Sequence, residues 1–256
     1  MKKLLLILVC LPMIGFGQNL VANGDFEEYS VLPTGGGQVN NCLYWNDLNF
    51  VPGVFFPVWP FGSPDYFHAD ADINTGVSFP TNDFAYVNPY SGDAAIGFSN
   101  FLTTQGNPIF PTKSFFFADN YREYISSKLN TKLEIGEIYE LSFYLTNGEN
   151  PTHGSSSNNI GVYFSTDSLT QDTSEVIYVI PQIEIANEVW ETSWVNFSFS
   201  FIADEEFQFI TIGNFNHNNQ TSSTYIDTTA SLDWSYFFID KIELYKSENY
   251  SVSCEN

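Results

Sequence analysis

The sequence predicts an all-β fold, an antiparallel jelly-roll β-sandwich of about 8 to 10 strands with long aromatic-rich loops. Segments that alternate apolar and polar residues are frequent, whereas the periodicity of an amphipathic helix is almost absent. Aromatic residues make up 18% of the chain, and its 25 Phe and 15 Tyr favour strands over helices. Long stretches rich in Pro, Gly and Asn separate the alternating segments and predict loops.

The clearest strands are predicted in the second half of the chain. Residues 195–203 alternate Val or Phe with Asn or Ser, so one face of the strand is apolar and the other polar. Residues 122–129 fit a strand but could also hold a helical turn. The predicted strands are residues 94–98, 122–129, 138–147, 158–166, 175–183, 195–203, 207–215 and 236–245.

The loops are unusually long for a single domain. Residues 30–93 are dominated by Pro, Gly, Asn, Asp and aromatic residues, and their aromatic density predicts ordered loops rather than disorder. Residues 147–159 and 214–233 are predicted to be long polar hairpin loops. Because no linker-like segment or internal repeat is present, residues 18–246 are expected to form one domain, followed by a polar tail at 247–256.

The chain begins with a segment typical of export. Residues 1–17 contain two lysines, an apolar run at 4–14 and small residues before Gln18, a pattern that predicts a cleaved signal peptide. The run is too short to span a membrane. A lipoprotein anchored at Cys10 is the alternative, and Val9 disfavours it. We therefore expect a periplasmic, cell-surface or extracellular protein without membrane insertion after cleavage.

The charge of the chain is strongly negative. It has 30 acidic and 8 basic residues, which gives a net charge of −22. Such a protein repels phosphate backbones and anionic membranes, so nucleic acid is excluded as a partner. The acidity could serve solubility, or it could suit the binding of divalent cations or of neutral ligands rich in hydroxyl groups. The net charge alone does not distinguish between these two explanations.

No motif predicts catalysis. The three histidines, His68, His153 and His217, lie in expected loops without a nucleophile in a recognisable arrangement. With 30 acidic residues, a pair of carboxylates suited to glycoside hydrolysis carries no information. No catalytic residue is therefore assigned, and the protein is expected not to be an enzyme.

Two cysteines remain after the predicted signal peptide. Cys42 and Cys254 could form one disulfide in an oxidising compartment, and two free thiols are the alternative. No Cys-x-x-Cys pattern or histidine cluster indicates a zinc site.

Several short motifs occur in an order that resembles a known fold family. They read "NLVANGDFEEY" at 19–29, "SGDAAIGF" at 91–98, "GEIYELSFYL" at 136–145 and "FFIDKIEL" at 237–244. Their order resembles galactose-binding-like jelly rolls, which include the carbohydrate-binding modules of secreted glycanases. The sequence looks most similar to exported proteins of Bacteroidota-type bacteria with N-G-D-F-E, P-D-Y-F, R-E-Y-I and terminal I-D motifs. The resemblance covers nearly all residues after the signal peptide, and it implies fold more firmly than function.

The resemblance implies a structural calcium ion between the first and last strands. Glu27 and Asp240 match the positions where such modules supply carboxylates, and Asp25 and Asp93 are further candidates. Glu27 and Asp240 could instead face solvent. Asp240, however, has apolar neighbours, and burying an unpaired carboxylate costs several kcal/mol, so a cation or strong donor would have to compensate.

Aromatic side chains in the loops predict a platform for sugars. A sugar ring stacks its C–H face on Trp or Tyr, and short polar side chains bind its hydroxyl groups. Residues 40–70 combine such side chains, although many rings in so aromatic a sandwich must lie in the core. Trp59, between two prolines, is expected to be the most exposed. The candidate ligand-binding residues are Trp45, Trp59, Asp65, Tyr66, His68 and Trp190.

The predicted function is that of an exported, non-catalytic module that binds glycan or another extracellular ligand and holds a structural calcium. A cell-surface structural or adhesion protein is the alternative, and a glycan-degrading enzyme is a third possibility. An exposed aromatic strip with nearby amides would favour the binding module. A flat apolar patch of several hundred Å² would favour the structural or adhesion protein, and a cleft with two carboxylates ~5 to 9 Å apart would favour the enzyme.

Overall fold

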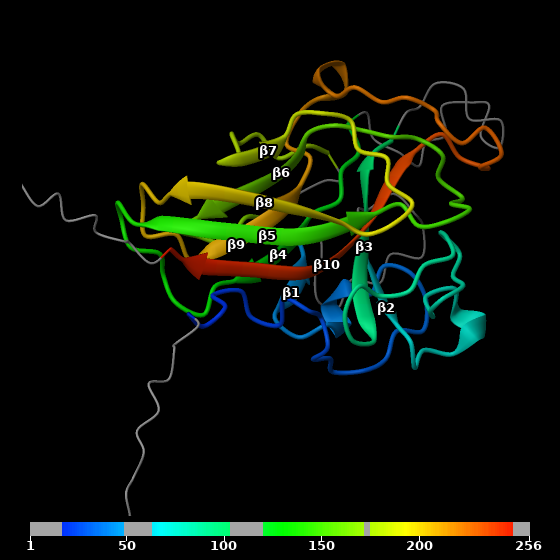
Figure 1. The fold of residues 1–256 in the computed structure, drawn as a ribbon, viewed down its shortest axis with the longest axis horizontal. Coiled ribbons are helices and arrows are strands. Elements are labelled where there is room, and N and C mark those ends of the chain that lie inside the picture. Colours follow the sequence, from blue (N-terminus) through cyan, green and yellow to red (C-terminus); the bar gives the residue numbers. More distant parts are fainter. Residues whose placement is uncertain (1–16, 49–62, 103–119, 172–174, 248–256) are drawn as a thin grey trace, which may run out of the picture.

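The computed structural model describes residues 17–48, 63–102, 120–171 and 175–247 and confirms the predicted jelly-roll β-sandwich (Figure 1). Two antiparallel sheets of five strands each pack face to face. The helical segments in these ranges are three 3-10 turns, η1 (Val39–Asn41), η2 (Ile73–Thr75) and η3 (Asn218–Gln220). None of the described helices is long and apolar enough to cross a membrane.

The two sheets are named here after one strand of each. The β10 sheet has the order β2-β3-β10-β5-β8, and the β9 sheet has the order β1-β4-β9-β6-β7. In Figure 1, β8, β5 and β10 lie side by side across the middle of the molecule. The strands of the β10 sheet are β2 (Asp65–His68), β3 (Ala94–Phe101), β10 (Ser235–Lys246), β5 (Ile138–Thr146) and β8 (Val195–Ile202). Those of the β9 sheet are β1 (Trp45–Asp47), β4 (Ile125–Lys128), β9 (Phe209–Gly213), β6 (Ile160–Ser165) and β7 (Ile183–Ile185).

The main core fills the space between the sheets. Alternation directs Leu141, Phe143 and Leu145 of β5 inward, and each is fully or almost fully buried. The three phenylalanines of β8 point to the same side but remain half-buried, because β8 is an edge strand paired with β5 alone among the described strands. The alternation read from the sequence therefore identifies the core face of both strands.

Most predicted strands are confirmed, with ends shifted by a few residues. The strand predicted at 175–183 is wrong: the described part of this segment is irregular, and β7 begins only at Ile183. Pro181 lacks the N–H that a ladder needs, and Ile180 before it is 90% exposed. Apolar content alone thus misidentified an exposed loop as a strand.

The start of the domain lies against the last strand, as expected, but it is not itself a strand. The N–H of Leu20 donates to the carbonyl of Leu244 at 2.9 Å, and the N–H of Ile242 donates to that of Gly24 at 2.7 Å. After the second contact the backbone turns, with Phe26 in the left-handed region at φ 62°. The turn drives the Phe26 ring into the core, where it is fully buried.

A second, smaller core covers the outer face of the β10 sheet. The chain between β2 and β3 folds back over this face and places Val77, Phe79 and Val87 on it. There they pack with Phe67 of β2 and Phe238 of β10. The ordered loops expected in this region are thus confirmed for the described residues, whereas 49–62 lie outside them.

Asp65 lies in the interior beside this second core. It is 5% exposed, and its carboxylate accepts hydrogen bonds from the Tyr236 hydroxyl at 2.5 Å and the Gly37 N–H at 2.6 Å. Burial, reinforced by the negative charge of Glu123, raises the pKa of Asp65 to about 8. Asp65 therefore favours its protonated form at neutral pH.

Glu123 is the second member of this buried carboxyl pair. Its carboxylate accepts hydrogen bonds from the Tyr121 hydroxyl at 2.6 Å and from the N–H groups of Ser99 at 2.6 Å and Ser63 at 3.1 Å. Burial raises the pKa of Glu123. Because Glu123 precedes β4 and Ser99 belongs to β3, the pair fastens the two sheets together near their edges.

The buried pair predicts a pH effect on stability. The folded pKa of Asp65, about 8, exceeds its unfolded value of ~3.9, so its contribution to stability is lost as pH rises through 8. We expect Asp65→Asn to reduce the fall in Tm between pH 5 and pH 9 by at least ~3 °C. A pKa difference of one unit between the folded and unfolded states corresponds to ~1.4 kcal/mol of stability, and 1 kcal/mol shifts Tm by ~2–4 °C. Thermal unfolding at several pH values measures this.

Exposed Asp204 provides the matched control. Asp204→Asn should leave the pH profile of the Tm unchanged. Asp240 titrates in an overlapping range, so the profiles are compared as differences from wild type. Parallel profiles for wild type and Asp65→Asn would contradict the assignment.

Candidate functional site

Two carboxylates hold the turn that leads into β3. One oxygen of Glu27 accepts hydrogen bonds from the N–H groups of Asp93 at 2.9 Å and Ala94 at 3.1 Å. Asp240 accepts one from the N–H of Ser91 at 2.9 Å. We call Glu27 and Asp240 the carboxylate clamp. Because Glu27 belongs to the N-terminal segment and Asp240 to β10, the clamp joins both of these segments to the turn before β3, and the three lie far apart in sequence.

Asp240 is the deeply buried member of the clamp. Its side chain has no exposed surface, and it also accepts a hydrogen bond from the N–H of Lys241 at 2.6 Å. Lys241 lies at φ 56°, where the pairing of β10 with β5 is interrupted. Burial raises the pKa of Asp240 to about 7, main-chain hydrogen bonds oppose the shift, and the charge of Glu27 adds to it. Within the described ranges no Lys or Arg forms a salt bridge with Glu27 or Asp240.

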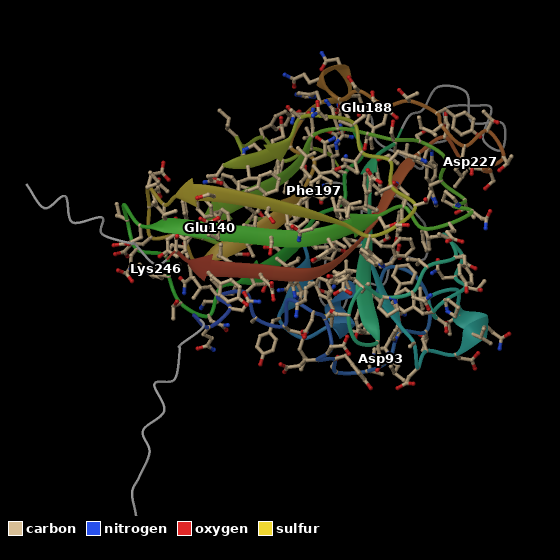
Figure 2. The ribbon with its side chains drawn as sticks, in the orientation of Figure 1. Asp93, Glu140, Glu188, Phe197, Asp227 and Lys246 are labelled. Atoms are coloured by element: carbon tan, nitrogen blue, oxygen red, sulfur yellow. The ribbon has the colours of Figure 1, made fainter. Side chains whose placement is uncertain are left out.

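The clamp suits a hard cation in donor type and in charge. Calcium takes six to eight oxygen ligands, and beside the two carboxylates the buried hydroxyl of Ser91 has no hydrogen-bond partner. Asp25 is half-buried and Asp93 is exposed, and Figure 2 shows Asp93 at the lower side of the folded chain. The described residues contain no group of three or more His, Cys, Asp or Glu that could hold a metal. Main-chain carbonyls would have to complete the coordination.

The structure places four residues of the predicted ligand platform in the interior. Trp45 is 1% exposed and donates its indole N–H to the carbonyl of Asn23 at 2.9 Å. Tyr66 is fully buried, and its hydroxyl donates to the carbonyl of Phe26 at 2.9 Å. His68 is buried edge-on against a tyrosine ring. With Asp65 in the buried pair, these four side chains fill the interior and offer no surface to a ligand. Trp59 lies outside the described residues.

The cysteine near the chain start is a buried thiol. Cys42 is 1% exposed, is free in this structure, and accepts a hydrogen bond from the Asn23 amide at 3.3 Å. Burial raises the pKa of this thiol, so it stays protonated. Cys254 lies outside the described residues, and the pairing of the two cysteines stays a prediction.

A surface hollow is formed by loops at the end of the sandwich where β5 ends and β8 and β10 begin. This end of the three strands is at the right of Figure 1. It has a volume of about 490 Å³ and lies between three loops. Asp227, labelled in Figure 2, marks its position. We call it the Trp190 hollow; its lining residues are Glu149, Asn150, Pro151, Trp190, Thr192, Ile226 and Asp227.

The hollow combines an aromatic wall with unpaired polar groups. The Trp190 ring is half-buried, and Ile226, 47% exposed, adds an apolar surface. The side chains of Asn150 and Thr192 are exposed, and neither they nor the Trp190 indole N–H have a hydrogen-bond partner in the described part of the chain. Their donors and acceptors are therefore available to a bound molecule.

Two carboxylates complete the lining of the hollow. Asp227 accepts hydrogen bonds from the N–H and the hydroxyl of Thr229 at 2.9 and 2.6 Å, which lowers its pKa and keeps it ionised at neutral pH. Glu149 is exposed at the opposite loop. No lining residue carries a positive charge. The hollow therefore disfavours anionic ligands.

A buried amide fixes the loops around the hollow. Asn147 accepts a hydrogen bond from the N–H of Glu191 at 2.8 Å and donates one to the carbonyl of Tyr236 at 2.8 Å. Asn150, at φ 48°, sits at the tip of the turn that follows. Trp190 is the one predicted ligand-binding residue that lines the hollow. The lining residues at 149–151 and 226–227 lie in predicted loops, and only the fold brings those loops together.

Comparisons with known proteins found similarity at the level of architecture. A scan of protein-family models and a search of curated proteins gave no match. Among solved structures, one similar protein is the xylan-binding domain CBM22-1 of Xyn10C from Paenibacillus barcinonensis, which is 13% identical to this chain with a TM-score of 0.40. The match covers 91% of this chain and 97% of that chain. The module TmCBM61, solved with β-1,4-galactotriose, is 16% identical, with a TM-score of 0.35, 90% of this chain and 99% of that chain covered.

A third similar structure is the enzymatically active domain of tailspike protein 4 of bacteriophage CBA120. It is 12% identical with a TM-score of 0.39, and the match covers 90% of this chain. The chain spans only 21% of that protein's length. At these identities and TM-scores the similarities carry no argument about function, and the likeness to Bacteroidota-type proteins stays a prediction.

Proposed function

We propose that the protein is an exported, non-catalytic carbohydrate-binding module that binds neutral glycan at the Trp190 hollow. The observation that carries the proposal is a half-buried tryptophan wall beside amide, hydroxyl and carboxylate groups with free hydrogen-bonding capacity. Sugars present an apolar C–H face and a rim of hydroxyl groups, which this combination fits. The proposal of export rests on the signal-peptide pattern of residues 1–17.

The charges around the hollow narrow the class of glycan. Glu149 and Asp227 accept hydrogen bonds from sugar hydroxyls, and they repel carboxylate or sulfate groups. The net charge of −22 acts in the same direction. Neutral polysaccharides are therefore the proposed ligands, in preference to uronic acid or sulfated polymers.

Removing the aromatic wall tests the proposed site. Trp190→Ala should weaken binding to the best neutral glycan on an array roughly tenfold or more, because the loss of ring stacking amounts to about 1.4 kcal/mol. Asn150→Ala should weaken it less. Isothermal titration calorimetry of residues 18–256 gives the affinities.

Tyr178, 69% exposed and away from the hollow, supplies the control. Tyr178→Ala should bind as wild type does. If Trp190→Ala binds the same glycan with unchanged affinity, the hollow is not the site.

The proposal includes a structural calcium ion at the carboxylate clamp. Two neighbouring carboxylates without a cationic partner among the described residues support it, as does the buried, unpartnered Ser91 hydroxyl. The ion would neutralise Glu27 and Asp240 and tie the N-terminal turn to the last strand. It would have no part in catalysis.

Calcium should therefore stabilise the domain. We expect added Ca²⁺ to raise the Tm of metal-stripped protein and a chelator to reverse the rise, because a ligand of the folded state stabilises it by mass action. Asp240→Asn should abolish the response, and the exposed-site variant Asp204→Asn should retain it. An unchanged Tm under both treatments would rule out the calcium site.

A further inference from the structure

Three aromatic rings lie together on the outer face of the β10 sheet, beside the Trp190 hollow. The rings of Tyr90 and Tyr144 are stacked with centroids 3.6 Å apart and an interplanar angle of 17°. The ring of Trp194 meets Tyr90 edge-on at 6.3 Å. Tyr90 is 42% exposed, and the other two rings are half-buried. We call these three residues the aromatic strip.

Hydrogen bonds hold the strip in place. The indole N–H of Trp194 donates to the carbonyl of Asn88 at 2.8 Å. Tyr90 directly precedes Ser91, whose N–H is bound by Asp240 at 2.9 Å. Tyr144 belongs to β5 and pairs with Asp240 across the sheet. Because both segments beside the rings are fixed, a ligand loses little free energy by ordering them.

Hydroxyl and amide side chains border the strip. Tyr144 pairs with Asn196 of β8, and Ser142 pairs with Ser198 in the next row of the same face. The Ser198 hydroxyl donates to the Asn196 side-chain oxygen at 2.6 Å, and the Asn196 amide nitrogen has no partner in the described ranges. Glu140, labelled in Figure 2, lies further along β5 on this face. Such surroundings suit a ligand with an apolar face and hydroxyl edges better than an apolar protein surface.

One short segment carries both the hollow and the strip. Trp190 and Thr192 line the hollow, and Trp194 belongs to the strip. The segment is fixed because the N–H of Glu191 donates to the Asn147 side-chain oxygen and the N–H of Asn147 donates to the carbonyl of Glu191. Four residue steps span at most ~14 Å at ~3.5 Å each. The two surfaces are therefore near neighbours.

We infer that the ligand is an internal stretch of a neutral polysaccharide, which occupies the Trp190 hollow with one sugar unit and stacks a later unit on the aromatic strip. The inference rests on the proposed function and adds a second contact surface. Its consequence is that affinity grows with chain length, because a terminal sugar or disaccharide fills the hollow alone. A longer chain gains the contacts of Tyr90 and Asn196 as well.

A chain-length series tests the inference. The probes are xylan, galactan, mannan and β-glucan, and the di- to hexasaccharides of whichever polymer binds best, measured by affinity electrophoresis and calorimetry. Wild type should bind the hexasaccharide at least tenfold more tightly than the disaccharide. The double variant Tyr90→Ala/Tyr144→Ala should bind the disaccharide as wild type does and lose the gain with length. Trp190→Ala should weaken binding of both.

The outcomes separate the two proposals. Equal affinity for di- and hexasaccharide, or a gain with length that survives in the strip variant, overturns the strip and leaves the hollow as the site. No binding of wild type to any of the four polymers overturns both proposals. If the double variant has a reduced Tm, the single variant Tyr90→Ala, which removes the most exposed ring of the strip, is used in its place. This variant must lower the affinity for the hexasaccharide and leave the affinity for the disaccharide unchanged.

Discussion

The attachment of the turn at 91–94 to Glu27 and Asp240 is the constraint on which the rest of the structure depends. It joins the start of the domain, the strand β3 and the last strand, which no local interaction could bring together. Removing either carboxylate would leave main-chain N–H groups without acceptors, at a cost of about 1–3 kcal/mol for each buried group. The same turn carries Tyr90 to the outer face of the β10 sheet, so the stability of the sandwich and the position of its aromatic strip share one support.

A shortage of cations explains how the interior carboxylates are held. The chain has 8 basic residues, and the salt bridges among the described residues involve lysines at the surface, where ion pairs contribute little. Asp65, Glu123 and Asp240 are instead bound by main-chain N–H groups and tyrosine hydroxyls. Neutral donors offset only part of the cost of burying a charge. The elevated pKa values of these groups follow from that imbalance.

The fold was more predictable from the sequence than the site was. Alternation is a local property, so it correctly identified β5, β8 and β10. The apolar run at 175–183 does not alternate, and it gave a wrong strand where Pro181 interrupts pairing. Burial of Trp45 depends on how distant segments fold over it, and no local pattern records that. The Trp190 hollow likewise needs Asn150 and Asp227, which lie on separate loops. Its polar residues resembled those of any solvent-exposed hairpin.

The clamp and the proposed ligand surface are coupled through geometry. Tyr144 pairs with Asp240 across the sheet, and hydrogen bonds to Asp240 fix the main chain next to Tyr90. A group that stabilises the charged form of Asp240 therefore also restrains both stacked tyrosines. Restraint of the unbound rings lowers the entropy lost when a ligand stacks on them. At the proposed site, the acidic start of the domain would thus influence ligand binding at a distance, by ordering the aromatic strip, without any contact between Glu27 and the ligand.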